Sequence, residues 1–193
     1  MTVLIAAKRP TRLRWWPEIT GVLFGAAFAA ALLVGFADRD HFSQVLAAAG
    51  LVYLGAAALG RPGMAWPLFG VTFVLVGVGF AVPAFDPLWP LLVLAAVLTI
   101  VGVATGRWRP SWGLPLQLLA MGAIVVLVLF AGAIAAPLAG ILVGAGLLAH
   151  AGWDIRHIRS GRVVATTMAQ FCAALDVVLA VTIIVATAIG STK

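Results

Sequence analysis

The chain has 193 residues, of which 64% are hydrophobic and only 9% are charged. Soluble globular proteins carry about 25% charged residues, so this chain has too little polar sequence to cover a surface facing water, and we expect lipid to solvate it. The formal net charge is +6, but the basic residues stand in short clusters between apolar runs, which argues against a nucleic-acid partner. The single cysteine, Cys172, excludes an internal disulfide.

A short basic segment at residues 1–16 precedes the first apolar run, and this order imitates a secretory signal peptide. The apolar run from Ile19 to Ala37 is nevertheless long enough to span a bilayer, which takes roughly 20 residues. We therefore expect a retained first helix after a basic cytoplasmic segment, within a single transmembrane domain over residues 1–193.

Seven apolar segments follow one another along the chain, and each is close to the length of a bilayer span. They cover residues 17–37, 42–60, 65–83, 87–105, 112–135, 137–158 and 164–189. Connections rich in glycine, proline and charge separate them, as in "GRPGM" and "GRWRPSW". The sequence thus predicts an all-α integral membrane protein with a bundle of seven transmembrane helices. If Pro137 does not separate the fifth and sixth segments, the number of spans falls to six.

The distribution of lysine and arginine predicts the orientation of the bundle. With the N-terminus in the cytoplasm, ten of the twelve basic residues lie on the cytoplasmic side, and the exceptions are Arg39 and Lys193. This is the bias of the positive-inside rule. We expect a multi-pass protein of the plasma (inner) membrane of a bacterium, with its C-terminus outside. The lipid bilayer is its expected partner, and the sequence leaves the oligomeric state open.

The sixth segment carries an unusual group of ionisable residues, in the stretch "HAGWDIRHIRSGRVV". At 100° per residue, Asp154 lies about 40° and His157 about −20° from His150, so the three share one helix face. Arg156 and Arg159 fall on the far side, where their heads can reach lipid head groups.

The seventh segment carries Asp176 on a face of small residues, and the opposite face, with Phe171, Leu175, Val178 and Val181, is expected to meet lipid. A helical hairpin that turns near residue 161 places Cys172 level with His150 and Asp176 about one turn deeper. A hydrogen bond between His150 and Asp176 is therefore predicted. An ionisable residue at this depth points to function, although the pair could also simply lock two helices together.

These residues define a candidate site that faces the cytoplasm. The expected acid–base groups are His150, Asp154, His157 and Asp176. A divalent metal could be held by His150, Asp154 and Asp176, with His157 behind them, because the two histidines are about 10.5 Å apart along the helix axis. The remaining candidates are pocket-lining residues (Cys172, Gln117, Tyr53 and Glu18) and contacts to an anionic head group (Arg156, Arg159 and Arg162). Each of two candidates also has a simpler explanation. Cys172 could merely fill space in an apolar core, and Glu18 could stabilise the N-terminus of the first helix.

Three functions are compatible with this pattern. The first is a membrane-embedded enzyme that acts on a lipid-like substrate or small molecule from the cytoplasmic leaflet by acid–base or metal-assisted chemistry. The second is a transporter or channel that uses Asp176 and His150 as a proton or cation relay. The outer halves of the predicted spans argue against it, because they hold only four polar side chains, Ser43, Gln44, Thr182 and Thr187. The third is a non-catalytic membrane subunit, so the sequence does not decide whether the protein is an enzyme.

Overall fold

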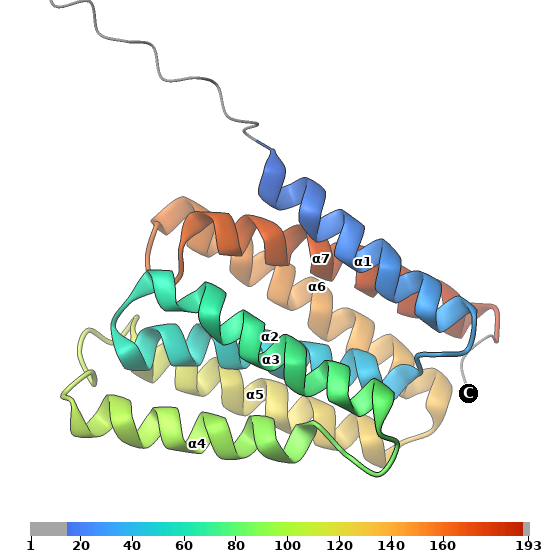
Figure 1. Cartoon of the computed structure of the whole chain (residues 1–193), viewed down its shortest axis with the longest axis horizontal. Helices are drawn as coiled ribbons and strands as arrows, with labels where there is room; N and C mark the ends of the chain where they lie inside the picture. Colours follow the sequence, from blue (N-terminus) through green and yellow to red (C-terminus); the bar gives the residue numbers. More distant parts are fainter. Residues whose placement is uncertain (1–14, 191–193) are drawn as a thin grey trace, which may run out of the picture.

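The computed structural model describes residues 15–190, and its regular elements are all helices (Figure 1). In chain order they are α1 (Trp16–Leu33), α2 (Arg39–Leu59), the short 3₁₀ helix η1 (Pro62–Met64), α3 (Ala65–Ala81), α4 (Leu88–Ala104), α5 (Leu114–Ala133), α6 (Ala136–Ser160) and α7 (Thr166–Ala188). The predicted all-α bundle is confirmed. Six of the described helical segments are long and apolar enough to cross a membrane, and α4, with 17 residues, is a shorter apolar helix.

The predicted break near Pro137 is present, and α5 and α6 are separate helices. Helix α5 ends at Ala133, Ile134 is extended, and α6 begins at Ala136 with Pro137 in its first turn. Proline suits this position because the first N–H groups of a helix have no partner within it. The described part of the chain therefore holds seven α-helices in alternating directions.

Helix α2 is the central element and the most buried of the described helices. It packs against α3, α4, α5 and α6 (Figure 1). Phe42, Leu46, Leu51 and Leu54 are fully buried on different sides of it, which is the pattern of a helix surrounded by other helices. Its side chains can therefore reach sites on more than one neighbour.

Helix α1 lies along α7, and this corrects the predicted lipid-facing side of the seventh segment. Gly21 and Gly25 allow the close approach: a Cβ on Gly21 would collide with the carbonyl oxygen of Phe171, and one on Gly25 would lie 2.8 Å from Val178 Cβ. Phe171 and Leu175 are buried rather than exposed to lipid, and Val178 is half-buried, whereas Val181 is exposed as predicted. The prediction was wrong for the part of this face that α1 covers, because it considered the α6–α7 hairpin alone.

The described arginines other than Arg39 all lie at one end of the bundle, which we call the arginine end. They are Arg61, Arg107, Arg109, Arg156, Arg159 and Arg162, in or beside the connections α2–α3, α4–α5 and α6–α7. Figure 1 shows these three connections together on the left of the view. The basic segment at residues 1–14 and Lys193 lie outside the described residues, so the assignment of the arginine end to the cytoplasm stays a prediction.

Candidate functional site

The predicted polar face of α6 is present. His150, Asp154 and His157 are all buried, and Asp154 is completely inaccessible. Arg156 and Arg159 are exposed on the other side of the helix, as the helical angles predict. Helix α6 ends at Ser160 and is followed by Gly161, whose φ of 61° is the left-handed conformation that glycine adopts most easily. This sharp end lets α7 return directly alongside α6.

Helix α7 brings Asp176 to His150, as the hairpin model predicts. His150 Nδ1 and Asp176 Oδ2 are 2.8 Å apart, and Asp154 Oδ2 lies 3.6 Å from the same nitrogen. Asp176 is completely inaccessible, and one ligand atom from each of the three residues lies within 4.8 Å of the other two. We call His150, Asp154 and Asp176 the His/Asp cluster.

Tyr53 of α2 completes the surroundings of the cluster from a third helix. Its hydroxyl donates a short hydrogen bond to Asp154 Oδ1, and its ring makes an edge-on contact with the ring of His150, with centroids 5.3 Å apart. The sequence indicated Tyr53 only as a pocket-lining candidate, because periodicity does not fix the rotation of a helix that is apolar all round. Tyr53 is the single tyrosine of the chain, and this was the one sign in the sequence that it could have a special role.

Three polar atoms of the cluster are buried without a hydrogen-bond partner among residues 15–190. They are His150 Nε2, Asp154 Oδ2 and Asp176 Oδ1. Buried polar atoms in proteins are nearly always paired, so an unpaired one calls for an explanation such as a bound ion, a ligand or a catalytic role. Three such atoms within one small cluster make it the candidate functional site of the described residues, although Asp154 Oδ2 also lies 3.6 Å from His150 Nδ1.

His157 belongs to a different set of contacts, nearer the arginine end. Its Nδ1–H donates to the carbonyl oxygen of Trp153 (2.9 Å), which leaves Nε2 to accept from the Gln117 amide (3.4 Å). Trp153 Nε1–H donates to Gln117 Oε1 (3.3 Å) and closes the ring of contacts. Both nitrogens of His157 are satisfied, and it is not one of the three ligand-bearing residues that lie within 4.8 Å of one another.

The other predicted site residues are not among the three residues of the cluster. Cys172 is buried, and its thiol donates to the sulfur of Met168 (3.5 Å). Glu18 is half-buried in the first turn of α1. Arg156 and Arg162 stack over Trp153 and Trp112 at 5.3 and 4.9 Å, and Arg159 is exposed. These three arginines lie beyond the buried part of α6, at its arginine end.

Two cavities reach the cluster from opposite sides of α2. A cavity of about 210 Å³ between α2, α5 and α6 is lined by Tyr53, Gln117 and His150 among others. A larger groove of about 680 Å³ lies between α1 and α3, over α2 and α7, and is lined in part by Cys172 and Asp176. The cluster therefore has apolar space beside it that a hydrocarbon chain could occupy.

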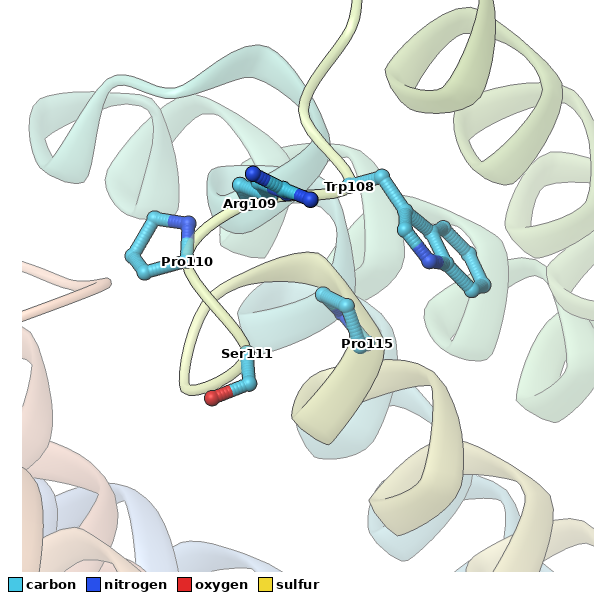
Figure 2. A pocket seen from close by; sticks show the side chains of 5 residues that line it. All are labelled: Trp108, Arg109, Pro110, Ser111 and Pro115. Atoms are coloured by element: carbon cyan, nitrogen blue, oxygen red, sulfur yellow. The ribbon is translucent and has the colours of Figure 1, made fainter.

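A third pocket, of about 790 Å³, is an open surface depression in the α4–α5 connection at the arginine end (Figure 2). It is lined by Trp108, Arg109, Pro110, Ser111 and Pro115. None of these residues belongs to the His/Asp cluster. Apart from Arg109, this lining offers no ionisable side chain, so the pocket is a poor candidate for acid–base chemistry.

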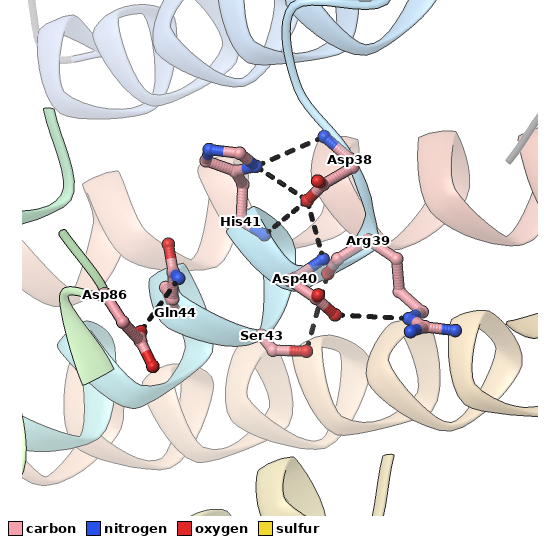
Figure 3. A network of polar contacts seen from close by, with 7 residues as sticks. All are labelled: Asp38, Arg39, Asp40, His41, Ser43, Gln44 and Asp86. Carbon is pink, nitrogen blue, oxygen red and sulfur yellow. Dashed lines mark hydrogen bonds and ion pairs between the residues drawn. The ribbon is translucent and has the colours of Figure 1, made fainter. Parts of the chain in front are cut away.

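The opposite end of the bundle carries an exposed polar network at the start of α2 (Figure 3). Asp38 caps the helix by accepting from the backbone N–H groups of Asp40 and His41, and its Oδ1 lies 2.7 Å from His41 Nδ1. Partial burial acts to raise the pKa of Asp38, but the hydrogen bonds from His41 and Asp40 outweigh it and hold that pKa below its usual value. This network stabilises a helix start, and it is remote in the sequence and in the fold from the cluster.

No family model, curated protein or solved structure matches this chain. The interpretation of the site therefore depends on its geometry and its chemistry.

Proposed function

We propose that the protein is a membrane-embedded enzyme that acts on a lipid-like substrate, with the His/Asp cluster as its active site. One observation carries this proposal: three ionisable residues from α6 and α7 converge in a fully buried place and keep three polar atoms unpaired. A cluster that only held helices together would gain stability by pairing these atoms with donors on neighbouring helices. Placing ionisable groups at this depth is costly, and the cost is commonly associated with function.

Acid–base chemistry follows from the way His150 is held. The carboxylate of Asp176 accepts a hydrogen bond from Nδ1–H, which favours this tautomer and leaves a lone pair on Nε2. A histidine oriented by a carboxylate on one nitrogen and free on the other is suited to act as a general base. Tyr53 restrains Asp154 by its hydrogen bond, so the second carboxylate is held beside the base.

Metal-assisted chemistry is the other form of the same proposal. One imidazole nitrogen and two carboxylates form a donor set that suits Zn²⁺ or Mn²⁺. Three protein ligands would leave a coordination position for water or for an oxygen atom of the substrate. The separation of at most 4.8 Å between the donor atoms is compatible with one shared ion after small side-chain rotations.

The test is a combined measurement of metal content and turnover on protein in lipid nanodiscs. We expect conversion of at least one member of a panel of lipid alcohols, aldehydes, esters and phospholipids, and its loss in Asp176→Asn, which is nearly isosteric. Thr182→Val, a similarly small change on α7, is the matched control and should keep the activity, since Thr182 only donates to the backbone of Val178. Absence of both turnover and bound metal in well-folded protein would overturn the proposal.

A proton or cation relay is the second candidate, and one observation favours it. The cluster stands between two cavities, with His150 and Tyr53 lining one and Asp176 lining the other. Ion flux into proteoliposomes tests this function separately. A flux that disappears in Asp176→Asn would support the relay, and the absence of flux in the unaltered protein would exclude it.

A further inference from the structure

The groove between α1 and α3, which we call the α1–α3 groove, has a lining that is almost entirely apolar. Three polar side chains, those of Thr72, Cys172 and Asp176, are found among its described lining residues. The Thr72 hydroxyl donates to the carbonyl of Phe69 and the Cys172 thiol to Met168, whereas Asp176 Oδ1 is buried and has no hydrogen-bond partner in the described chain. Among these three lining residues, Asp176 therefore carries the unpartnered acceptor, which a ligand would meet only after the side chains that cover it move.

The depth of this acceptor can be estimated from the helix rise. Asp176 is ten residues after the start of α7 at Thr166, which is about 15 Å along the helix axis. The hydrocarbon core of a bilayer is about 30 Å thick, so the carboxylate lies near its middle. From this level the groove extends past Leu179 and Val76 to Phe36 and Phe80 at the end opposite the arginines, with apolar lining along the way.

The walls of the groove open toward the bilayer. Helix α1 packs on α7 and α3 packs on α2, and aromatic contacts such as Phe24–Phe73 and Phe28–Phe80 bridge the space between α1 and α3. Phe24 and Phe73 are 43% and 55% exposed, which places them on the surface that meets lipid. A hydrocarbon chain can therefore enter sideways, by movement of aromatic side chains and without a change in the helix packing.

These features select the head group of the ligand. A phosphate at the bilayer centre would be costly, would meet the carboxylate of Asp176, and would lie far from the exposed arginines at the end of α6. An unpaired acceptor calls for a donor, and a hydroxyl is the small uncharged donor that a lipid can carry. The volume of about 680 Å³ lies within the usual range of ligand pockets, about 300–1,000 Å³.

We propose that the α1–α3 groove binds a single-chain lipid alcohol, whose hydroxyl donates to Asp176 Oδ1 and whose hydrocarbon chain extends toward Phe36 and Phe80. This inference rests on the proposed function, because it names the class of substrate. It also changes the expected head group, since the sequence pointed to an anionic one held by Arg156, Arg159 and Arg162.

Photolabelling of the full chain in nanodiscs tests the inference without requiring turnover. The probe is geranylgeraniol with a diazirine at the far end of its chain, and we expect it to label the segments around Phe36 and Phe80. Unlabelled geranylgeraniol should compete. Its methyl ether, which cannot donate, should compete about tenfold more weakly, since a hydrogen bond to a charged group contributes enough for this difference. Phosphatidylglycerol and geranylgeranyl diphosphate should compete no better than the methyl ether.

A pair of glycines on α3 supplies the matched variants. Gly77 lines the groove and Gly70 does not, and a Cβ on either would meet no atom within 4 Å. Gly77→Phe should therefore fill the groove and remove the labelling, while Gly70→Phe should leave it unchanged. Equal labelling in the two variants, or equal competition by phosphatidylglycerol, would show ordinary lipid contact and overturn the inference.

The same experiment separates this inference from the proposed function. Alcohol-specific labelling with no turnover of any lipid would support the proposed binding site and contradict the proposed enzymatic function. Turnover that persists in Gly77→Phe would support the enzymatic function and contradict the α1–α3 groove as the substrate site, because the substrate would then reach the His/Asp cluster by another route.

Discussion

Replacing His150 and Asp176 singly and together measures whether the two side chains act as one unit. His150→Ala leaves two carboxylates, Asp154 and Asp176, without the ring that lies between them. Asp176→Ala leaves His150 with Asp154, whose Oδ2 is already 3.6 Å from Nδ1 and can move closer. We therefore expect His150→Ala to be the more destabilising single variant, and the double variant to lose less than the sum of the two.

The size of the coupling energy between His150 and Asp176 can be estimated from their distance and from values known for membrane proteins. Breaking a buried pair by removing one partner costs about 3–5 kcal/mol in soluble proteins, but coupling energies across membrane helices average about 0.6 kcal/mol and reach about 1.7 kcal/mol. The His150–Asp176 distance of 2.8 Å places this pair at the strong end, while competition from Asp154 weakens it. We expect a coupling of about 1–1.5 kcal/mol.

Equilibrium unfolding in mixed micelles, applied to all four members of the cycle, gives this coupling directly. His157→Ala combined with Asp176→Ala is the matched control, because in the described chain His157 is hydrogen-bonded to Gln117 and Trp153 and packs on the ring of Tyr53, and it shares no hydrogen bond with Asp176; we expect little coupling. Additivity within about 0.5 kcal/mol for His150 and Asp176 would refute the interaction on which the site depends.

Three further variants test other parts of the structure. Tyr53→Phe should destabilise the protein by about 1–3 kcal/mol, because it leaves both oxygens of Asp154 without a hydrogen bond; an unchanged midpoint of unfolding would show that this bond contributes nothing. Gly25→Leu should separate α1 from α7 and lower the midpoint, whereas Gly70→Leu, on an open face of α3, should not; equal effects would contradict the close packing of α1. Asp38→Asn should reduce stability near pH 7 but not at low pH: the pKa of Asp38 is depressed in the folded protein, so its contribution is present above the unfolded pKa and disappears as the pH falls through the folded one. A pH-independent difference between the unaltered protein and Asp38→Asn would contradict this.

The number and order of the helices could be predicted because a bilayer imposes a length on each span. The predicted boundary near Pro137 is confirmed, because proline is well suited to the first turn of a helix and disrupts a helix when it lies in the middle. The pairing of His150 with Asp176 was also predictable. It needs only helical angles, the rise per residue and the short turn at Gly161, all of which are local properties of one hairpin.

Contacts between distant helices could not be predicted in the same way. In a chain where most helices are apolar on every side, the pattern of side chains does not fix how a helix is rotated. For that reason the donation from Tyr53 to Asp154 and the ring formed by Gln117, Trp153 and His157 were visible only in the structure. The α1–α3 groove could not be predicted either. It exists because α1 packs on α7 and α3 packs on α2, and the sequence does not specify these contacts.

A high-resolution crystal structure of the protein in a lipid phase is the most direct test of whether the His/Asp cluster is a functional site. We expect a metal ion or the oxygen atom of a bound ligand within bonding distance of at least one of His150 Nε2, Asp154 Oδ2 and Asp176 Oδ1. Anomalous scattering would distinguish a metal from an oxygen atom. If instead all three atoms are bonded to other protein atoms, with no further component between them, the cluster is a structural pairing of α6 and α7 and the proposed active site is wrong.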